Sequence, residues 1–408
     1  MLLRSSHIPA SLKSLIFLFL LISNVLTLTT AQAQPLKRTA QSETVVCERK
    51  TIPRFSIGTN LLHRRPIQTL QGQLPRGFGS APASKTLQYV HDIGMHGVVL
   101  PVPIHAKSRL GATVSPGILG TQEGLGRLQR MIQDAHQEGL FVVLVPHLIL
   151  DDGEWRGELG MISYGEESPL RRDKVHLSTF FREYNEAIQP IINVAEKNCV
   201  EVFSFALELK SLSSIQDTQP HFKALIKKIR KGFSGVLTYS ANWDEATDVL
   251  FWDELDVISI NAFYPLSSSP TDRPFHMDKR ARAIQAQLMK LKNKHGRPIW
   301  FLEMGYKSTT HTARQPWVWP EALSTETKPD HQAQADAFNA MIQSFYESSA
   351  ITGVFFWALP SDAAVPLSNH PYEPEYGFGY LGKPSEGLIR KFIANPPKRT
   401  QDINIRAR

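Results

Sequence analysis

Short apolar runs alternate with longer amphipathic stretches along most of the 408-residue chain. The short runs are rich in Val, Ile and Phe, which is typical of buried strands, and the longer stretches carry apolar residues at helical spacing. The runs predict eight strands, at 55–60, 98–104, 141–147, 202–208, 236–243, 257–263, 298–303 and 353–357. The stretches predict helices near 84–95, 122–138, 176–197, 219–231, 244–252, 278–294, 332–349 and 385–394.

Eight strand–helix units predict an α/β fold, a single-domain (β/α)8 TIM barrel, rather than an open sheet. We place the barrel at residues 53–396, after an N-terminal linker or arm (34–52) and before a basic C-terminal tail (397–408). The turns before the strands are short, and the active site of a barrel enzyme is built from the loops after them. The asymmetry favours an enzyme, because long segments follow strands three, six, seven and eight, at 148–175, 264–277, 304–331 and 358–384.

Two of the predicted strands end in a glutamate, Glu208 on the fourth and Glu303 on the seventh. Burying a carboxylate costs several kcal/mol unless it is paired. Because side chains alternate between the faces of a strand, we expect both glutamates to point inward and Leu207 to point outward. The predicted inward sets are Ser204, Ala206 and Glu208 on the fourth strand, Ile299, Phe301 and Glu303 on the seventh, and Phe355 and Trp357 on the eighth.

Glycosidases use such a pair of carboxyl groups for catalysis. In a retaining enzyme the two groups lie about 5–5.5 Å apart, one protonating the leaving oxygen and the other attacking the sugar carbon. Strands four and seven face each other across the mouth of a barrel, so we assign Glu208 as acid/base and Glu303 as nucleophile. The alternative for either glutamate alone is a structural ion pair with a nearby Arg or Lys.

Five segments at or near the predicted strand ends carry a resemblance to a known family. They are Leu-Glu-Leu-Lys-Ser-Leu (207–212), Ser-Ala-Asn-Trp (240–243), Asp-Val-Ile-Ser-Ile-Asn-Ala-Phe-Tyr-Pro-Leu (256–266), Glu-Met-Gly-Tyr-Lys-Ser (303–308) and Pro-Trp-Val-Trp (316–319). The family that they resemble is glycoside hydrolase family 113. The resemblance runs over most of residues 55–392, and the block around Glu303 is its most specific part. It implies a clan of retaining β-glycosidases with paired glutamates on strands four and seven, and mainly β-1,4-mannanase activity.

The chain departs from that clan directly before the acid/base, where Asn or another small polar residue usually binds the sugar 2-hydroxyl. Here the position is Leu207, preceded by Ala206. Hydrogen bonds to that hydroxyl strengthen in the transition state. We therefore expect a lower rate than in a typical family member and a blunted preference between manno- and gluco-configured substrates. Leu207→Asn is expected to raise activity on one of them.

Aromatic and amide side chains near the strand ends are the candidate substrate ligands. Tyr264 is also expected to hydrogen-bond Glu303, which would hold the nucleophile ionised. Tryptophan is common in cores, and Trp252 and Trp300 are predicted to be core residues. The predicted substrate-binding set is Asn242, Trp243, Asn261, Tyr264, Trp155, Trp317, Trp319 and Trp357, with Trp357 at the pocket floor.

The N-terminus has the pattern of an export signal. Arg4 and Lys13 precede a short apolar stretch, and Ala31-Gln32-Ala33 supplies small residues for cleavage. We predict a signal peptide at residues 1–33 and an exported mature protein, in periplasm or medium, without stable membrane insertion; an uncleaved anchor is the alternative. In an oxidising compartment Cys47 and Cys199 would form one disulfide, with two buried free thiols as the alternative.

Charge and motif content narrow the classes of partner. The net charge of +7 falls to +5 without the predicted signal peptide, and the basic run 227–231 is typical of a solvated helix face rather than a nucleic-acid site. No pattern indicates a cofactor or a metal, so we expect neither. The prediction is an exported, monomeric retaining glycoside hydrolase acting on β-linked polysaccharides or oligosaccharides. The alternative is a barrel that binds glycans with weak or no hydrolysis.

Overall fold

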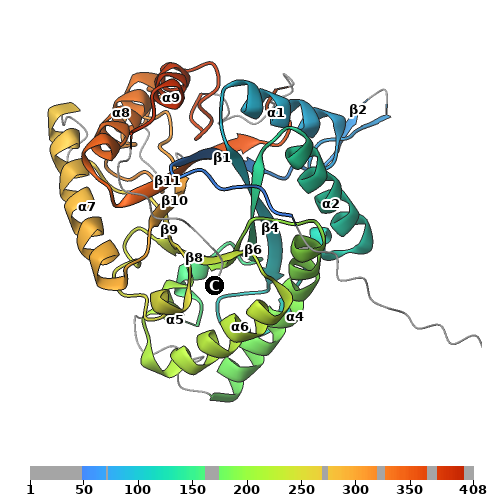
Figure 1. Cartoon of the computed structure of the whole chain (residues 1–408). Helices are drawn as coiled ribbons and strands as arrows, with labels where there is room; N and C mark the ends of the chain where they lie inside the picture. Colours follow the sequence, from blue (N-terminus) through green and yellow to red (C-terminus); the bar gives the residue numbers. More distant parts are fainter. Residues whose placement is uncertain are drawn as a thin grey trace, which may run out of the picture. The chain divides into compact units, whose positions relative to one another are not determined.

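The computed structural model describes residues 48–69, 72–160, 174–268, 274–318, 327–364 and 375–398, all within one compact unit. Eight parallel strands form a closed barrel, because β1 pairs with β11 on one side and with β4 on the other (Figure 1). This confirms the predicted (β/α)8 barrel and all eight strands. They are β1 (Ser56–Leu62), β4 (Gly97–Ala106), β6 (Phe141–Leu150), β7 (Val202–Leu207), β8 (Val236–Asn242), β9 (Ile258–Asn261), β10 (Ile299–Met304) and β11 (Ile351–Pro360).

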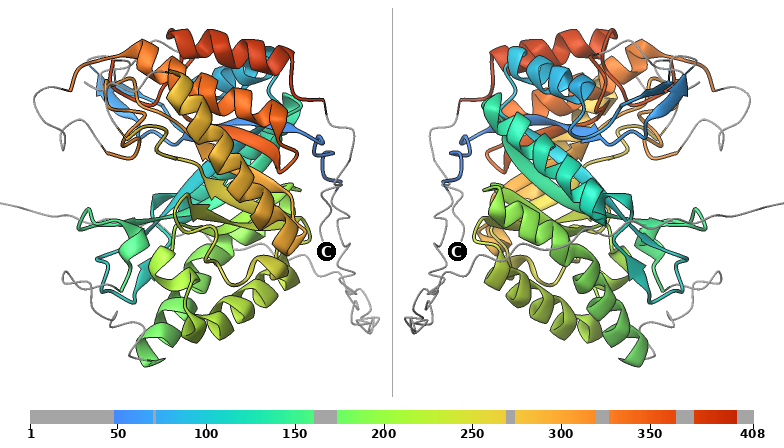
Figure 2. Two further views of the ribbon diagram at one scale, coloured as in Figure 1. Left: turned by 90° about the vertical axis from the view of Figure 1, so that its left-hand side faces the viewer. Right: turned by 90° about the vertical axis from the view of Figure 1, so that its right-hand side faces the viewer.

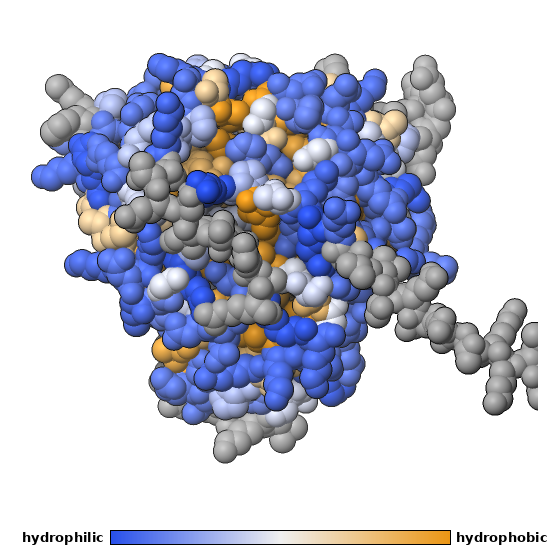
Figure 3. Space-filling model, viewed as in Figure 1, coloured by the Kyte–Doolittle hydropathy of each residue, from blue (hydrophilic) through white to orange (hydrophobic). Residues whose placement is uncertain are grey.

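A ring of helices surrounds the strands, with α7 and α8 on one side and α2 and α4 on another (Figure 2). The ends of several helices are fixed by side-chain caps; Asp330, for example, accepts a hydrogen bond of 2.8 Å from the Ala333 amide. The face of the molecule seen in Figure 3 is largely hydrophilic, with hydrophobic residues visible mainly toward its middle. The long helices are α1 (Ala81–Asp92), α2 (Gln122–Gln137), α4 (Lys174–Lys197), α6 (Gln219–Gly232), α7 (Pro274–His295), α8 (His331–Glu347) and α9 (Pro384–Ala394).

The prediction of a helix at 244–252 is wrong. This segment forms turns, and only the 3-10 helix η4 (Trp252–Glu254) follows. Its Glu245 carboxylate turns inward and accepts a hydrogen bond of 2.9 Å from the backbone amide of Asn242. A side chain that binds nearby backbone in this way favours a turn over a helix.

The barrel also carries small elements that the sequence pattern did not predict. The hairpin strands β2 and β3 follow β1, and β5 pairs antiparallel with β4. Within the described residues, no helix is long and apolar enough to cross a membrane. The additional elements are β2 (Ile67–Thr69), β3 (Gly72–Leu74), β5 (Val114–Ser115), α5 (Lys210–Ser213), η1 (Ile118–Gly120), η2 (Arg156–Glu158) and η3 (Gln216–Thr218).

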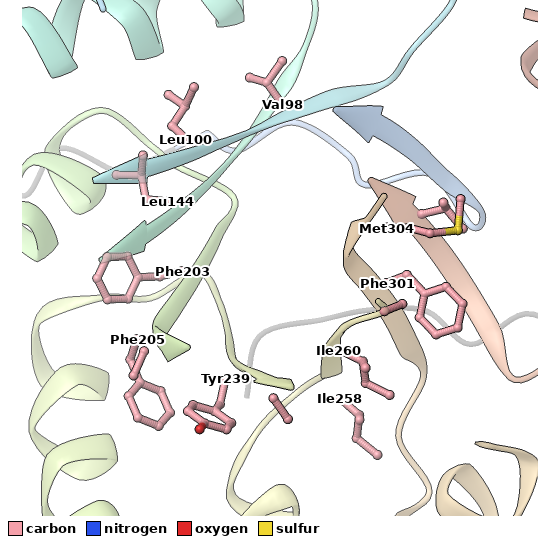
Figure 4. Packing of buried hydrophobic residues seen from close by; sticks show 14 of the residues in the cluster. Val98, Leu100, Leu144, Phe203, Phe205, Tyr239, Ile258, Ile260, Phe301 and Met304 are labelled. Carbon is pink, nitrogen blue, oxygen red and sulfur yellow. The ribbon is translucent and has the colours of Figure 1, made fainter. Parts of the chain in front are cut away.

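Two apolar layers stabilise the fold, one outside the strands and one inside the barrel. Phe203, Phe205 and Phe301 belong to the outer layer and point away from the barrel axis toward the helices (Figure 4). Trp252 is fully buried in the same layer, as predicted. The inner layer contains Val99, Phe141, Val143, Val145, Val202, Leu207, Val236, Val257, Trp300, Leu302 and Phe355.

The predicted face alternation holds for β11 but fails on the two strands that carry the glutamates. Each has one extra residue relative to its neighbour, between Ser204 and Leu207 on β7 and between Phe301 and Met304 on β10. A bulge of one residue moves the following side chains to the opposite face. Leu207 therefore lies in the inner layer, while the predicted inward residues Ala206, Ile299 and Phe301 pack in the outer one.

One of the two cysteines lies in the described part of the chain. Cys199 follows α4 and is disulfide-bonded, so the alternative of two free thiols is wrong. Cys47, the other cysteine of the sequence, lies outside the described residues. The predicted signal peptide and most of the predicted arm lie outside them too.

Candidate active site

A pocket of about 710 Å³ contains both glutamates. Its walls come from the end of β6 and the loop after it, from the ends of β7, β8 and β11, and from the segments after β9 and β10. This is the carboxyl end of the strands, where barrel enzymes carry their active sites. The lining residues are His147, Leu148, Ile149, Leu150, Gly153, Glu154, Trp155, Arg156, Glu208, Asn242, Trp243, Asp244, Phe263, Glu303, Trp317, Trp357 and Phe378.

Glu208 is held by an unusual backbone conformation immediately after β7. Its φ of +51° lies in the left-handed region, which non-glycine residues seldom adopt. Its amide donates a hydrogen bond of 2.8 Å to the carbonyl of Ser240 on β8. Simple alternation after the inward Leu207 would turn Glu208 outward, so the left-handed conformation is what directs its side chain into the pocket. Strain of this kind concentrates at functional sites.

Glu303 reaches the pocket through the bulge in β10. Leu302 faces the barrel interior, and the extra residue lets Glu303 face the pocket directly above it. The Glu303 carbonyl accepts a hydrogen bond of 2.5 Å from the amide of Ala262, which fixes the backbone at this point. The glutamate is only 6% exposed.

Asn261 lies between the two carboxyl groups. Its amide donates 3.0 Å to Glu208 Oε1, and its own oxygen accepts 2.5 Å from the hydroxyl of Ser240. The same side chain is near enough to Glu303 to lower the pKa of that carboxyl. Asn261 is fully buried and does not line the pocket, so the structure places it under the glutamates rather than against a substrate.

The two glutamates differ in their electrostatic surroundings. Arg156 Nη1 and Trp155 Nε1 both donate to Glu208 Oε2, at 2.5 and 3.2 Å. Burial, followed by the charge of Glu208, raises the pKa of Glu303 well above its usual value, while Arg156 and Asn261 oppose this shift. In the substrate-free protein Glu303 therefore favours its protonated form, while Glu208 is paired with Arg156. A retaining enzyme needs the reverse arrangement at the start of the reaction if Glu208 is the acid.

Aromatic rings line the pocket on several sides. Trp243 and Trp317 stack on each other with centroids 5.4 Å apart, and Trp317 is 43% exposed. Trp155 lies over Glu208, while Trp357 packs near His147 at 6.4 Å between centroids. Partly exposed rings of this kind can stack on sugars. The structure brings together all these predicted tryptophans; Trp319 lies outside the described residues.

Of the predicted ligands Asn242 and Tyr264, only Asn242 lines the pocket. Its side-chain amide donates 2.8 Å to Asp244 Oδ1. Tyr264 is buried beside Trp243, with ring centroids 5.9 Å apart, and does not line the pocket. Among the described residues it makes no hydrogen bond to Glu303, so the predicted contact is wrong.

Two important residues were missed from the sequence. Arg156 was hidden in the long segment after the third strand, and nothing in its neighbourhood indicates an ion pair with a residue 52 positions away. Glu245 was assigned to the predicted helix; it is 1% exposed and accepts hydrogen bonds of 2.5 Å from the hydroxyls of Ser213 and Tyr239. A glutamate three residues after a strand end was the available signal.

In the described part of the chain, no cluster of His, Cys, Asp and Glu is arranged to hold a metal ion. The polar groups of the pocket are instead engaged with one another. The arrangement can therefore supply a carboxyl pair, an amide and aromatic walls to a bound molecule.

Comparison with known proteins identifies relatives of this barrel. A family model described as Glycoside Hydrolase Family 113 matches residues 83–377, which include both glutamates. No curated protein matches the chain. Among solved structures, a complex of a β-1,4-mannanase of family 113 aligns with a TM-score of 0.66 at 20% identity, covering 84% of this chain and 99% of that one.

Two further structures show how far the shared fold extends. The family 113 β-mannanase from Alicyclobacillus acidocaldarius, in complex with ManMIm, aligns with a TM-score of 0.64 at 20% identity, over 85% of this chain and 98% of that one. A β-glucuronidase from Faecalibacterium prausnitzii aligns with 0.53 at 14% identity, over 85% of this chain and 50% of that one. At these identities the structures share the barrel fold.

Proposed function

The chain belongs to glycoside hydrolase family 113 and is a glycoside hydrolase, and from this premise we propose that it is an exported retaining enzyme acting on β-1,4-mannan-like glycans. The observation that carries the retaining mechanism is that Glu208 and Glu303 lie together in one pocket, close enough for the charge of Glu208 to raise the pKa of Glu303. Retaining enzymes hold their two carboxyl groups about 5–5.5 Å apart for direct attack on the sugar, whereas inverting enzymes hold them about 6.5–9.5 Å apart to admit a water.

The proposed reaction has two steps. In the first, the Glu303 carboxylate attacks the anomeric carbon, the bond to the leaving oxygen breaks, and Glu208 gives its proton to that oxygen. In the second, Glu208 as carboxylate takes a proton from water while the water oxygen attacks the same carbon and releases Glu303. The proton returns to Glu208, so each cycle consumes one glycosidic bond and one water. Asn261 can hold Glu208 in place throughout, because its amide donates to Glu208 Oε1.

The proposed substrate class rests on the pocket and on the relatives. Two solved structures of the same family are described as β-1,4-mannanase and β-mannanase. Trp155, Trp243, Trp317 and Trp357 give the pocket walls that can stack on sugar rings, and Asn242 offers an acceptor to a hydroxyl. Activity should be compared on matched manno-, gluco- and xylo-oligosaccharides, since the aromatic walls alone do not select among them.

Product stereochemistry and variants test the mechanism. Proton NMR during hydrolysis should show the β-anomer first, and the α-anomer first would overturn the proposal. Glu208→Gln and Glu303→Gln should each lower turnover by orders of magnitude with the fold intact. Azide should rescue Glu208→Ala to a β-glycosyl azide and Glu303→Ala to an α-glycosyl azide, using a glycoside with an activated leaving group. The opposite pattern would exchange the two roles.

Binding without efficient hydrolysis is the second candidate function. The observation that favours it is the ion pair of Glu208 with Arg156, because an arginine beside the assigned acid opposes its role as a proton donor. Titration calorimetry with mannan oligosaccharides, followed by product analysis of the same samples, separates the two. Tight binding with intact oligosaccharide would favour the binding protein.

Export is supported by the apolar N-terminal pattern and by the disulfide at Cys199, which suits an oxidising compartment. Cell fractionation and N-terminal sequencing of the mature protein provide the test. A mature chain that begins near Gln34 is expected. Recovery of a chain that begins at Met1 in the cytoplasmic fraction would refute export.

A further inference from the structure

Every carboxylate oxygen of Glu208 accepts a hydrogen bond in the substrate-free protein. Oε1 accepts from Asn261 at 3.0 Å, and Oε2 accepts from both Arg156 at 2.5 Å and Trp155 at 3.2 Å. An arginine keeps its charge in a protein, so its bond to Glu208 favours the charged carboxylate over the protonated one. Glu208 is thus prepared for the second step of the proposed reaction, in which it acts as a base, and not for the first.

The first step needs a proton on Glu208, and a donor that favours the charged carboxylate must loosen its contact for that proton to be held. Asn261 cannot leave, because it is fully buried on β9 and tied to Ser240. Trp155 and Arg156 belong to the loop after β6, and both line the pocket. Since Arg156 supplies the charge, it is the donor whose movement decides the protonation of Glu208.

Arg156 has two further contacts besides Glu208, and because the guanidinium is a rigid plane, these contacts turn with it when Nη1 leaves Glu208. Its Nε donates 2.6 Å to the carbonyl of Leu148, and its Nη2 donates to His147 Nε2. Burial and the arginine charge lower the pKa of His147 well below its usual value, so this imidazole is neutral and acts as an acceptor. These two contacts hold the guanidinium at the rim of the pocket, where its side chain is 16% exposed.

We propose that Arg156 is a specificity-determining latch on Glu208, which is released by a leaving group that offers hydrogen-bond acceptors to the guanidinium. A sugar as leaving group has such acceptors in its hydroxyl and ring oxygens, whereas a simple alcohol or phenol has none beyond the bond that breaks. When the guanidinium turns to the leaving sugar, the proton held by Glu303 transfers through the open pocket to Glu208. That single transfer creates both the acid and the charged nucleophile, with no net change in protons.

The inference rests on the proposed function. It predicts a preference among leaving groups that substrate binding alone would not produce. In the wild type, oligosaccharides should be cleaved efficiently, but phenyl glycosides of the same sugar should be poor substrates because they do not release the latch. Dinitrophenyl glycosides need no proton on the leaving oxygen and therefore report the nucleophilic step by itself. The ratio of kcat/KM for phenyl to dinitrophenyl glycosides isolates the acid.

The test compares this ratio in the wild type, Arg156→Met and Arg156→Lys. Arg156→Met should raise the ratio about tenfold or more, the effect expected for one charge-assisted hydrogen bond. Arg156→Lys retains the charge and should stay near the wild-type ratio. An unchanged or lower ratio in Arg156→Met would overturn the latch.

A matched control separates the latch from the folding of its loop. Arg109 binds Glu158 in the same loop at 3.1 Å and makes no contact with Glu208. Arg109→Met should loosen the loop without raising the ratio, and melting temperatures of both variants report the loosening. An equal rise in Arg109→Met would mean that loop mobility, not the ion pair, controls the acid.

A second measurement needs no turnover. Carbon-13 NMR of protein labelled at the glutamate side-chain carboxyl, assigned with Glu208→Gln and Glu303→Gln, shows which of the two groups carries the proton. The proton should lie on Glu303 in the wild type and move to Glu208 in Arg156→Met. A proton that stays on Glu303 in the variant would overturn the latch, whereas a wild type that cleaves no glycoside would overturn only the proposed function.

Discussion

Substituting glutamine for Glu245 is expected to change how the stability of the protein depends on pH. Burial raises the pKa of this carboxyl from 4.5 to about 7, against the opposing hydrogen bonds from Ser213, Tyr239 and the Asn242 amide, and with a further raising contribution from the charge of Glu208. The folded protein therefore holds a proton that the unfolded chain releases over this range. Its contribution to the free energy of unfolding is fully present below pH 4.5 and is lost as the pH rises to about 7.

The size of the effect follows from the shift. Each pKa unit corresponds to about 1.4 kcal/mol, so the contribution is about 3 kcal/mol. The glutamine variant cannot titrate at this position. The difference in unfolding free energy between the wild type and Glu245→Gln should move by about 3 kcal/mol in favour of the variant between pH 4.5 and pH 7.5.

Urea unfolding of both proteins at several pH values gives this difference directly, and groups common to both proteins cancel. Ser213→Ala provides a sharper check, because the Ser213 hydroxyl lowers the pKa of Glu245. Without it, the pH dependence should extend to higher pH. A wild-type minus Glu245→Gln difference that stays constant across the range would refute the reasoning.

Three further substitutions test other parts of the structure. Lys307 is buried and donates 2.8 and 3.0 Å to the carbonyls that flank Trp317; Lys307→Met should raise KM for oligosaccharides about fivefold, as expected for the loss of one aromatic contact worth about 1 kcal/mol, with a smaller change in kcat. Leu207 is 1% exposed in the inner layer, so Leu207→Asn should lower the unfolding free energy by about 1–3 kcal/mol. The variant should not show the gain in activity that the sequence suggested. A variant that is faster and equally stable would refute this. Cys199→Ser should cost about 2–4 kcal/mol in urea unfolding, and reduction of the wild type should give the same loss.

The barrel could be predicted because its strands are short apolar runs of a length that only buried strands favour. Both glutamates could be placed as well, since a charge at the end of such a run is costly anywhere except in a polar pocket. The faces of the strands could not be predicted. A bulge is an extra residue opposite a neighbouring strand, and the bulges before Leu207 and Met304 depend on pairings with β8 and β11 that a single strand does not reveal.

Contacts of the site could be predicted where the residue directly follows a strand, and could not where its partner is distant in the sequence. Asn242 and Trp243 follow β8 directly, and both line the pocket as expected. Arg156 was not predictable, because its partner Glu208 is distant in the chain, beyond α4 and β7, and the segment around Arg156 has no periodic pattern. Tyr264 was misassigned for the same reason, since a ring at a strand end can turn toward either neighbour, and here it packs against Trp243.

The two glutamates are held by different kinds of structure, and this has a consequence for specificity. Glu303 is fixed by a bulge in a buried strand, so changes around it must pass through the barrel core. Glu208 takes two of its three hydrogen-bond donors from Trp155 and Arg156, which lie on one loop at the rim. Loop substitutions can therefore alter proton donation while the nucleophile stays in place. If the latch operates, changes in leaving-group preference should arise from the loop after β6, and changes in the sugar that is attacked should arise from the residues around Glu303.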